Sequence, residues 1–367
     1  MLLAVTAAAA LLPSVLLVWF FRARDVHPEP AGALWATFGL GILSTLPTVV
    51  VALPLEAVLR ALALPAAPAA LLDAFFCAAL PEEFFKLCVL LFYVRPHRAF
   101  DEPMDGIVYG VVASLGFATF ENVLYTAGGG LVTALLRAFT AVPMHAACGA
   151  IMGYYVGQAS FAPNPPLGRL LAAYLWPVLI HGVYDAPLLW MASIDSSSGG
   201  EVPDAVALLA LLGVGSSLLS LGCAAGWSLL LVRRLRREQL RLLREGRFVL
   251  LDPALAGPAP VGRVLDAGAD TATPAPPASE GRAAWPFILA GGAACVFGGL
   301  VLVASTAFLA LGDPARNATA TALGSLFCLG LFPLGAGLFA FARGVSRLGA
   351  PQRRLSPYRR RTGDAPS

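Results

Sequence analysis

The chain has 367 residues, of which 58% are hydrophobic and only 13% are charged, and its mean hydropathy is +0.75. An ordinary soluble domain has about 25% charged residues, so this composition excludes a soluble globular protein and indicates a multi-pass membrane protein. The formal net charge of +3 is small and the basic residues stand in a few clusters, which favours a role in topology over a nucleic-acid surface. We therefore expect no nucleic-acid partner.

Apolar stretches long enough to cross a bilayer recur along the whole chain, since a spanning helix needs about 20 mostly apolar residues. We expect an all-α, polytopic bundle of about nine spans. They lie near residues 2–21, 34–53, 67–94, 105–127, 131–159, 168–192, 205–232, 285–311 and 319–342. We interpret the first as a membrane anchor rather than a signal peptide, because no positive segment precedes it and "FRARD" follows it.

Basic clusters predict the orientation, since loops rich in Lys and Arg stay on the cytoplasmic side. The strongest are "RRLRREQLRLLREGR" at 233–247 and "RRLSPYRRR" at 353–361. Alternation back from them also places residues 21–24, residues 95–98 and Arg169 inside. We therefore expect a protein of the cell membrane (the cytoplasmic or inner membrane), surrounded by lipid, with its N-terminus outside and its C-terminus inside.

Changes in composition divide the chain into four parts. Residues 1–33 form an N-terminal anchor span and first loop, and 34–232 a membrane core. Residues 233–284 form a basic juxtamembrane helix, expected to lie against anionic headgroups, and a Pro/Ala-rich cytoplasmic linker. Residues 285–367 form a two-span hairpin with a basic tail. Nearly every intramembrane charge lies in the core, so we expect the chemistry there.

The stretch "PEEFFKLCVL" at 81–90 carries three charged residues inside an expected span, although each such charge costs roughly 2.5–3.5 kcal/mol at the centre of a spanning helix. At 100° per residue, Glu82, Glu83 and Lys86 share one helix face. Two carboxylates this close in a low dielectric do not both ionise freely, so one suits a base and the other an acid or an orienting group. Pro81 is expected to kink the helix and free the carbonyl of Cys77.

The next three spans each add ionisable groups near mid-membrane depth. "FATFENVLY" carries Glu121, and "HGVYD" places His181 and Asp185 one helical turn apart. His145 begins a stripe of small residues, spaced by four, that predicts close helix packing: Gly149, Gly153 and Gly157. Arg137 is expected to snorkel to the membrane surface and is left out of the site.

The six cysteines all lie in apolar runs, with no CxxC pair and no Cys/His spacing of the zinc type. They are interpreted as small core residues. Lys86 beside the glutamates places a fixed positive charge where a metal would lie, which opposes its binding, so we expect neither a metal nor another cofactor.

Three motifs occur in order on separate spans: E-E-x-x-K in "EEFFK", F-x-x-x-E in "FATFE" and H-x-x-x-D in "HGVYD". Together they resemble the PrsW family of intramembrane proteases, distant relatives of the CAAX-processing and bacteriocin-immunity membrane peptidases. In the wider group the motifs read E-E-x-x-x-R, F-x-x-x-H and H-x-x-x-N. The resemblance covers roughly residues 34–192, so the first span and the last two lie outside it.

This resemblance implies peptide hydrolysis by a glutamate-activated water. Glu82 would be the general base, with Glu83 and Lys86 as the partners that tune its charge. Glu121 would be a second group on the water. Amide hydrolysis needs such a base within hydrogen-bond reach of a water.

The same resemblance implies that His181 stabilises the oxyanion and that Asp185 orients its imidazole, with His145 as a further donor. The substrate would be a single-span regulatory membrane protein of the anti-sigma-factor kind.

Three other interpretations stay open from the sequence. His145, His181, Asp185 and a glutamate could form a metal shell, although no H-E-x-x-H motif is present. The same groups could relay protons in a transporter, although no internal repeat is evident. A non-catalytic scaffold that binds hydrophobic helices is the third.

Overall fold

The computed structural model describes residues 2–162, 167–197 and 204–245, and this part of the chain contains helices and loops but no strand. The all-α expectation is confirmed for these residues. The expected linker at 253–284 and the two expected spans beyond it lie outside the described residues.

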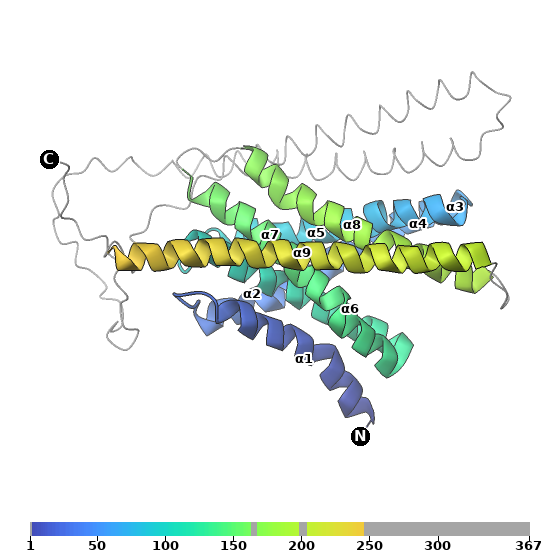
Figure 1. The fold of residues 1–367 in the computed structure, drawn as a ribbon, viewed down its shortest axis with the longest axis horizontal. Helices are drawn as coiled ribbons and strands as arrows, with labels where there is room; N and C mark the ends of the chain where they lie inside the picture. Colours follow the sequence, from blue (N-terminus) through green and yellow to red (C-terminus); the bar gives the residue numbers. More distant parts are fainter. Residues whose placement is uncertain (1, 163–166, 198–203, 246–367) are drawn as a thin grey trace, which may run out of the picture.

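Nine α-helices and two π-helical segments follow one another in the described part (Figure 1). They are α1 (Leu2–Arg22), α2 (Ala31–Leu43), α3 (Thr45–Ala61), α4 (Ala66–Leu72), η1 (Asp73–Ala79), α5 (Leu80–Val89), η2 (Leu90–Val94), α6 (Pro103–Phe139), α7 (Ala141–Ser160), α8 (Leu167–Ser197) and α9 (Asp204–Arg244).

Four helical stretches among the described residues are long and apolar enough to cross a membrane: Ala31–Ala61, Pro103–Ser160, Leu167–Ser193 and Ala207–Arg244. The first three contain the spans expected at 34–53, 105–127, 131–159 and 168–192, and the fourth overlaps the span expected at 205–232. The expected span at 67–94 is instead divided among α4, η1, α5 and η2. The total of nine spans and the orientation of the termini stay predictions.

The centre of the bundle is built by α7 and by the part of α6 that precedes Gly130. These two segments lie antiparallel, since Gly106 meets Gly153 and Gly110 meets Gly149. Gly130 has φ +68°, a left-handed conformation that glycine adopts without strain. The chain reverses there, between the spans expected at 105–127 and 131–159. A Cβ on Gly149 or Gly153 would collide with the carbonyl oxygen of Gly110 or Gly106. The close packing predicted from the glycine stripe is confirmed.

A π-helical segment precedes the charged stretch of α5. In η1 the N–H of Leu80 bonds to the carbonyl of Phe75, five residues back. Pro81 follows at the start of α5 and has no N–H to donate. The irregularity expected at Pro81 is thus a π-helical turn, a feature that often occurs at functional sites. It positions Glu82, Glu83 and Lys86 toward the bundle interior, where all three are buried.

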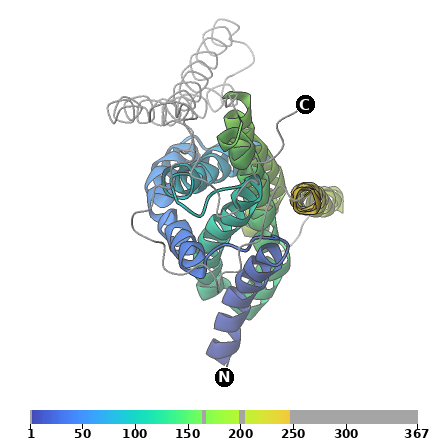
Figure 2. The same cartoon turned by 90° about the vertical axis from the view of Figure 1, so that its left-hand side faces the viewer.

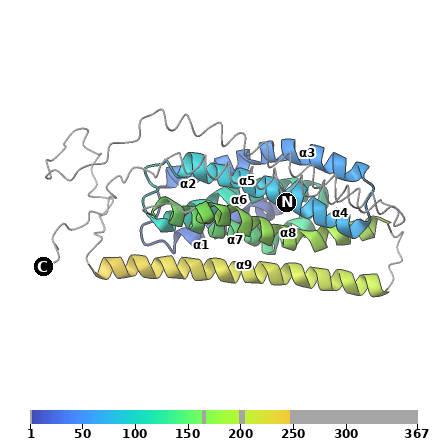
Figure 3. The same ribbon diagram turned by 90° about the horizontal axis from the view of Figure 1, so that it is seen from above.

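Helix α9 runs along one side of the bundle (Figures 2 and 3). It continues unbroken from Asp204 to Arg244, so the boundary expected at residue 232 falls inside a helix. Leu235 and Gln239 are buried against the bundle. The basic stretch after residue 232 is therefore an extension of α9 and not a separate short helix.

The segments expected on the cytoplasmic side gather at one end of the bundle. The amide of Gln239 donates to Asp25 and to Glu102, and the rings of Phe100 and Phe161 are 5.2 Å apart. This grouping is what the alternating topology requires. Which membrane side this end faces stays a prediction.

Candidate active site

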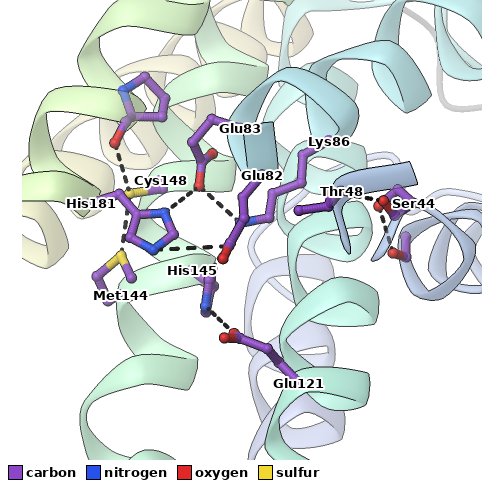
Figure 4. A network of polar contacts seen from close by, with 12 residues as sticks. Ser44, Thr48, Glu82, Glu83, Lys86, Glu121, Met144, His145, Cys148 and His181 are labelled. Atoms are coloured by element: carbon purple, nitrogen blue, oxygen red, sulfur yellow. Dashed lines mark hydrogen bonds and ion pairs between the residues drawn. The ribbon is translucent and has the colours of Figure 1, made fainter. Parts of the chain in front are cut away.

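The structure brings all seven candidate residues into one network inside the bundle. They come from four helices, and Figure 4 shows six of them, with Asp185 one turn beyond His181. The set is Glu82, Glu83 and Lys86 on α5, Glu121 on α6, His145 on α7, and His181 and Asp185 on α8.

Lys86 is the hub of this network and is fully buried. Its Nζ lies 3.2 Å from Glu82 Oε2 and 2.9 Å from Glu83 Oε1, as their shared helix face predicts. It also lies 3.0 Å from Nδ1 of His145 and 4.2 Å from the centre of the Phe117 ring. Because an ammonium group only donates, Nδ1 of His145 accepts, and the ring proton of a neutral His145 is on Nε2.

His181 joins the carboxylates of two helices. Its Nδ1 lies 2.9 Å from Glu83 Oε1, and its Nε2 lies 2.9 Å from Asp185 Oδ2. The same Nε2 is 3.9 Å from Glu82 Oε2. An imidazole can donate from both nitrogens only as the imidazolium, so this setting favours a positively charged ring beside Glu82.

Arg137, which the sequence analysis left out of the site, joins this network through Glu121. It lies 3.1 Å from Glu121 Oε2, 3.2 Å from Asn122 Oδ1 and stacks on Tyr125. Glu121 in turn accepts from Nε2 of His145 at 2.9 Å. Spacing along the chain could not reveal this contact, because the reversal at Gly130 folds Arg137 back onto Glu121.

A cavity of about 650 Å³ exposes only some of these groups. Glu82, Glu121 and Asp185 retain side-chain exposures of 10%, 20% and 24%, and all three line the cavity. Glu83 and Lys86 are at 0% and do not line it. The two adjacent glutamates therefore differ. Glu82 can contact a molecule in the cavity, whereas Glu83 contacts only protein groups such as Lys86 and His181.

The charges of the site almost balance. Four carboxylates, including Asp185, face Lys86, Arg137 and the ring of His181. Glu82 is the carboxylate with the longest contacts to these cations, at 3.2 and 3.9 Å. The negative charge of Glu82 is thus the least compensated of the four, and Glu82 is the carboxylate of α5 that reaches the cavity.

The residue types of this site suit a metal, but their arrangement does not. Glu82, Glu83, His145 and His181 each offer a donor atom, all within 4.8 Å of one another. However, both ring nitrogens of His145 face Lys86 and Glu121, and both of His181 face carboxylates. A divalent ion would have to displace Lys86 and break the contacts of both rings. The residues as they lie do not fit a metal.

Comparisons with known proteins identify the family of this chain. A family model described as "PrsW family intramembrane metalloprotease" matches residues 29–214, a range that contains every candidate residue. The chain belongs to the PrsW family. It is therefore an intramembrane protease, and the resemblance seen in its three motifs is confirmed.

Curated members named "Protease PrsW" match about half of the chain. The protein of Geobacillus kaustophilus is 43% identical over 183 residues, which is 50% of this chain and 79% of the relative. That of Halalkalibacterium halodurans is 39% identical over 182 residues (49% and 82%). That of Bacillus subtilis is 36% identical over 180 residues (48% and 80%). No solved structure gives a significant match.

Proposed function

We propose that this PrsW-family protease is an endopeptidase of the cell membrane in which Glu82 activates the attacking water. The observation that supports this most strongly is the difference between the adjacent glutamates. Glu82 lines the cavity, whereas Glu83 and Lys86 are sealed behind it. A general base must reach the water, and of the two only Glu82 does.

In this mechanism Glu82 accepts a proton from the water as its oxygen attacks the scissile carbonyl carbon. The carbonyl oxygen becomes an oxyanion, which His181 stabilises through its positive charge and not through a hydrogen bond, because Glu83 and Asp185 hold both of its N–H groups. Glu82 then returns the proton to the departing amide nitrogen, so that the peptide C–N bond breaks and one water is consumed. Asp185 and Glu83 orient His181 by holding its two nitrogens.

Glu121 and His145 complete the opposite wall of the site. Arg137 holds Glu121, which lines the cavity and can contact the same water. Nε2 of His145 donates to Glu121, and its Nδ1 faces Lys86. His145 thus connects Glu121 to Lys86, and through Lys86 to Glu82 and Glu83. Because both of its ring nitrogens are engaged, we assign His145 to positioning, and the further donor role implied by the resemblance is not proposed.

The substrate is proposed to be a single-span regulatory membrane protein of the anti-sigma-factor kind. The family resemblance supports the regulatory class. The cavity supports a membrane-embedded segment, because its walls are largely apolar, as at Val49 of α3, Phe120 of α6, Leu188 of α8 and Leu218 of α9. An extended apolar peptide would bury these side chains.

Co-expression with tagged single-span proteins tests the proposal. A cleaved fragment should appear with the wild type and disappear with Glu82→Gln, which keeps the volume and removes the charge. Glu238→Gln is the matched control, since this carboxylate is exposed on α9 at 52% and pairs only with a surface Arg241. Full cleavage by Glu82→Gln would contradict the role given to Glu82.

The mechanism is proposed to need no metal, although the family description contains the word metalloprotease. The ammonium group of Lys86, within 3.2 Å of both glutamates, supplies the positive charge that a metal would bring and opposes its binding. Purified protein should contain far less than one equivalent of zinc by elemental analysis, and cleavage should survive phenanthroline. A stoichiometric zinc content, together with inhibition by the chelator that added zinc reverses, would contradict the metal-free mechanism. His145 and His181 would then be zinc ligands.

A further inference from the structure

A second buried polar cluster lies away from the active site, at the end of the bundle where the loops meet. It joins the loop after α1, the loop before α6 and the first turn of α6. Its centre consists of Asp25, Glu29 and Asp105, each less than 7% exposed. One oxygen from each of the three carboxyl groups lies within 4.8 Å of the others. The proposed reaction uses none of them.

In two of these carboxyl groups, one oxygen accepts hydrogen bonds and the other oxygen has no partner. Asp105 is at 0% exposure; its Oδ2 accepts the backbone N–H groups of Asp101 and Glu102, both at 2.7 Å. Its Oδ1 is buried and has no hydrogen-bond partner. Asp25 Oδ1 accepts from the N–H of His27 and from Gln239, and Asp25 Oδ2 is likewise buried and unpartnered.

Glu29 is held in the same manner by Tyr109, whose hydroxyl group donates to Glu29 Oε2. Further acidic groups surround the three, because Asp101 and Glu102 both act electrostatically on Asp105. Nδ1 of His27 lies 3.0 Å from Glu102, so the nearest imidazole is bound to a different carboxylate.

Burying several carboxylates together is costly unless an opposite charge or a proton accompanies them. Burial, followed by repulsion from Glu102, raises the pKa of Asp25 to about 6. Burial also raises the pKa of Glu29 to about 8. One oxygen of each group nevertheless lies within 4.8 Å of the others, and a small cation among them would remove this cost.

We propose that Asp25, Glu29 and Asp105 form a binding site for a hard divalent cation, Ca²⁺ or Mg²⁺. All three donors are carboxylate oxygens, the ligands that these ions prefer, and no sulfur is among them. Ca²⁺ holds its oxygens at about 2.3–2.6 Å, so ligands on opposite sides of it can be nearly 5 Å apart. The spacing in this cluster is compatible with that.

Such an ion would connect the end of α1, the start of α2 and the start of α6. Asp25 follows α1, Glu29 precedes α2 and Asp105 starts α6, while Gln239 connects Asp25 to α9. The bound ion would therefore stabilise this end of the bundle at a distance from the catalytic groups, and its effect should appear in stability and not only in turnover.

Binding is tested on the purified full chain in detergent, after chelation and removal of the chelator. Equilibrium dialysis with radioactive Ca²⁺ should give about one equivalent bound. Adding millimolar Ca²⁺ or Mg²⁺ should raise the unfolding temperature by roughly 2 °C or more, since a ligand that binds only the folded state stabilises it. Asp105→Asn keeps an acceptor for the backbone N–H groups and should lose both effects, as should Asp25→Asn.

Two matched variants keep the proposal falsifiable. Glu238→Gln removes an exposed carboxylate on α9 and should retain both cation effects. Glu82→Gln removes a donor of the active-site cluster and should retain them too. The proposal is overturned if Glu82→Gln abolishes cation binding while Asp105→Asn keeps it. It is also overturned if the wild type binds neither ion at millimolar concentration, because Asp25, Glu29 and Asp105 then hold protons instead.

Discussion

Two glutamates adjacent in the sequence have different surroundings, because a helix turns about 100° from one residue to the next. Glu82 faces the cavity, whereas Glu83 faces Lys86 and His181 and is fully buried. Removing the charge of Glu83 leaves two buried cationic groups without their closest counter-charge. Breaking a buried pair in this way is far more costly than losing a surface pair.

Glu83→Gln should therefore abolish cleavage and lower stability strongly, whereas Glu82→Gln should abolish cleavage and lower stability less, because Glu82 is 10% exposed and its loss leaves Lys86 paired with Glu83. Losing one partner of a buried ion pair costs about 3–5 kcal/mol, and losing a general base costs about 10²–10⁴ in rate. The checks are a cleavage assay and thermal unfolding in detergent for both variants. Equal unfolding temperatures for the two would contradict the positioning role of Glu83.

Arg137 provides a second test at the level of single residues. Arg137→Gln removes the cation that holds Glu121, and a hydrogen bond between charged groups is worth about 1.5–3 kcal/mol. Cleavage should fall by roughly 10- to 100-fold, which a progress curve on a cleavable substrate would measure. Arg60→Gln is the control, since Arg60 is 71% exposed and pairs with Glu56 on the surface; an equal loss there would refute the assignment.

Among the helices, the contact between α6 and α7 decides where His145 lies relative to Glu121. Glycines allow the two backbones to approach so closely that one added carbon would meet a carbonyl oxygen. Gly153 lies eight residues after His145 on the same stripe. The packing stripe and the chemical group thus share one helix face.

Gly153→Ala should destabilise the protein by about 1–3 kcal/mol, the usual cost of overpacking, because its Cβ would collide with the carbonyl oxygen of Gly106. Gly226→Ala on α9 is the control, since a Cβ there meets nothing within 4 Å, and alanine favours a helix by up to about 1 kcal/mol. Thermal unfolding in detergent compares them. Similar stability changes in both would mean that the close approach is unimportant.

For the molecule as a whole, the described bundle extends beyond the family match. The match ends at residue 214, yet Gln239 on α9 donates to Asp25 at 2.7 Å and to Glu102 at 2.6 Å. In the same way α1 precedes the match but bonds to α6, through Ser14 to Thr119. Both helices are integral to the bundle.

A chain that ends near residue 252 should insert, fold and still cleave substrate, because it keeps every contact described. A chain that ends near residue 232 loses Leu235 and Gln239 and should unfold at a lower temperature. Protease accessibility and thermal unfolding distinguish them. A well-folded but wholly inactive chain ending near 252 would show that later residues belong to the active unit.

The sequence by itself determined that the protein lies in a membrane, that it is helical, which family it belongs to and which seven residues are candidates for the site. These follow from local patterns: hydropathy over about 20 residues, a shared helix face for Glu82, Glu83 and Lys86, and a glycine every fourth residue after His145. Tertiary structure decided which groups are in contact. Arg137 meets Glu121 only because the chain reverses at Gly130. Lys86 reaches His145 across 59 positions, and Asp25 and Gln239 meet across 214. No local pattern encodes such contacts, since they arise from helix packing and from the need to pair buried charges.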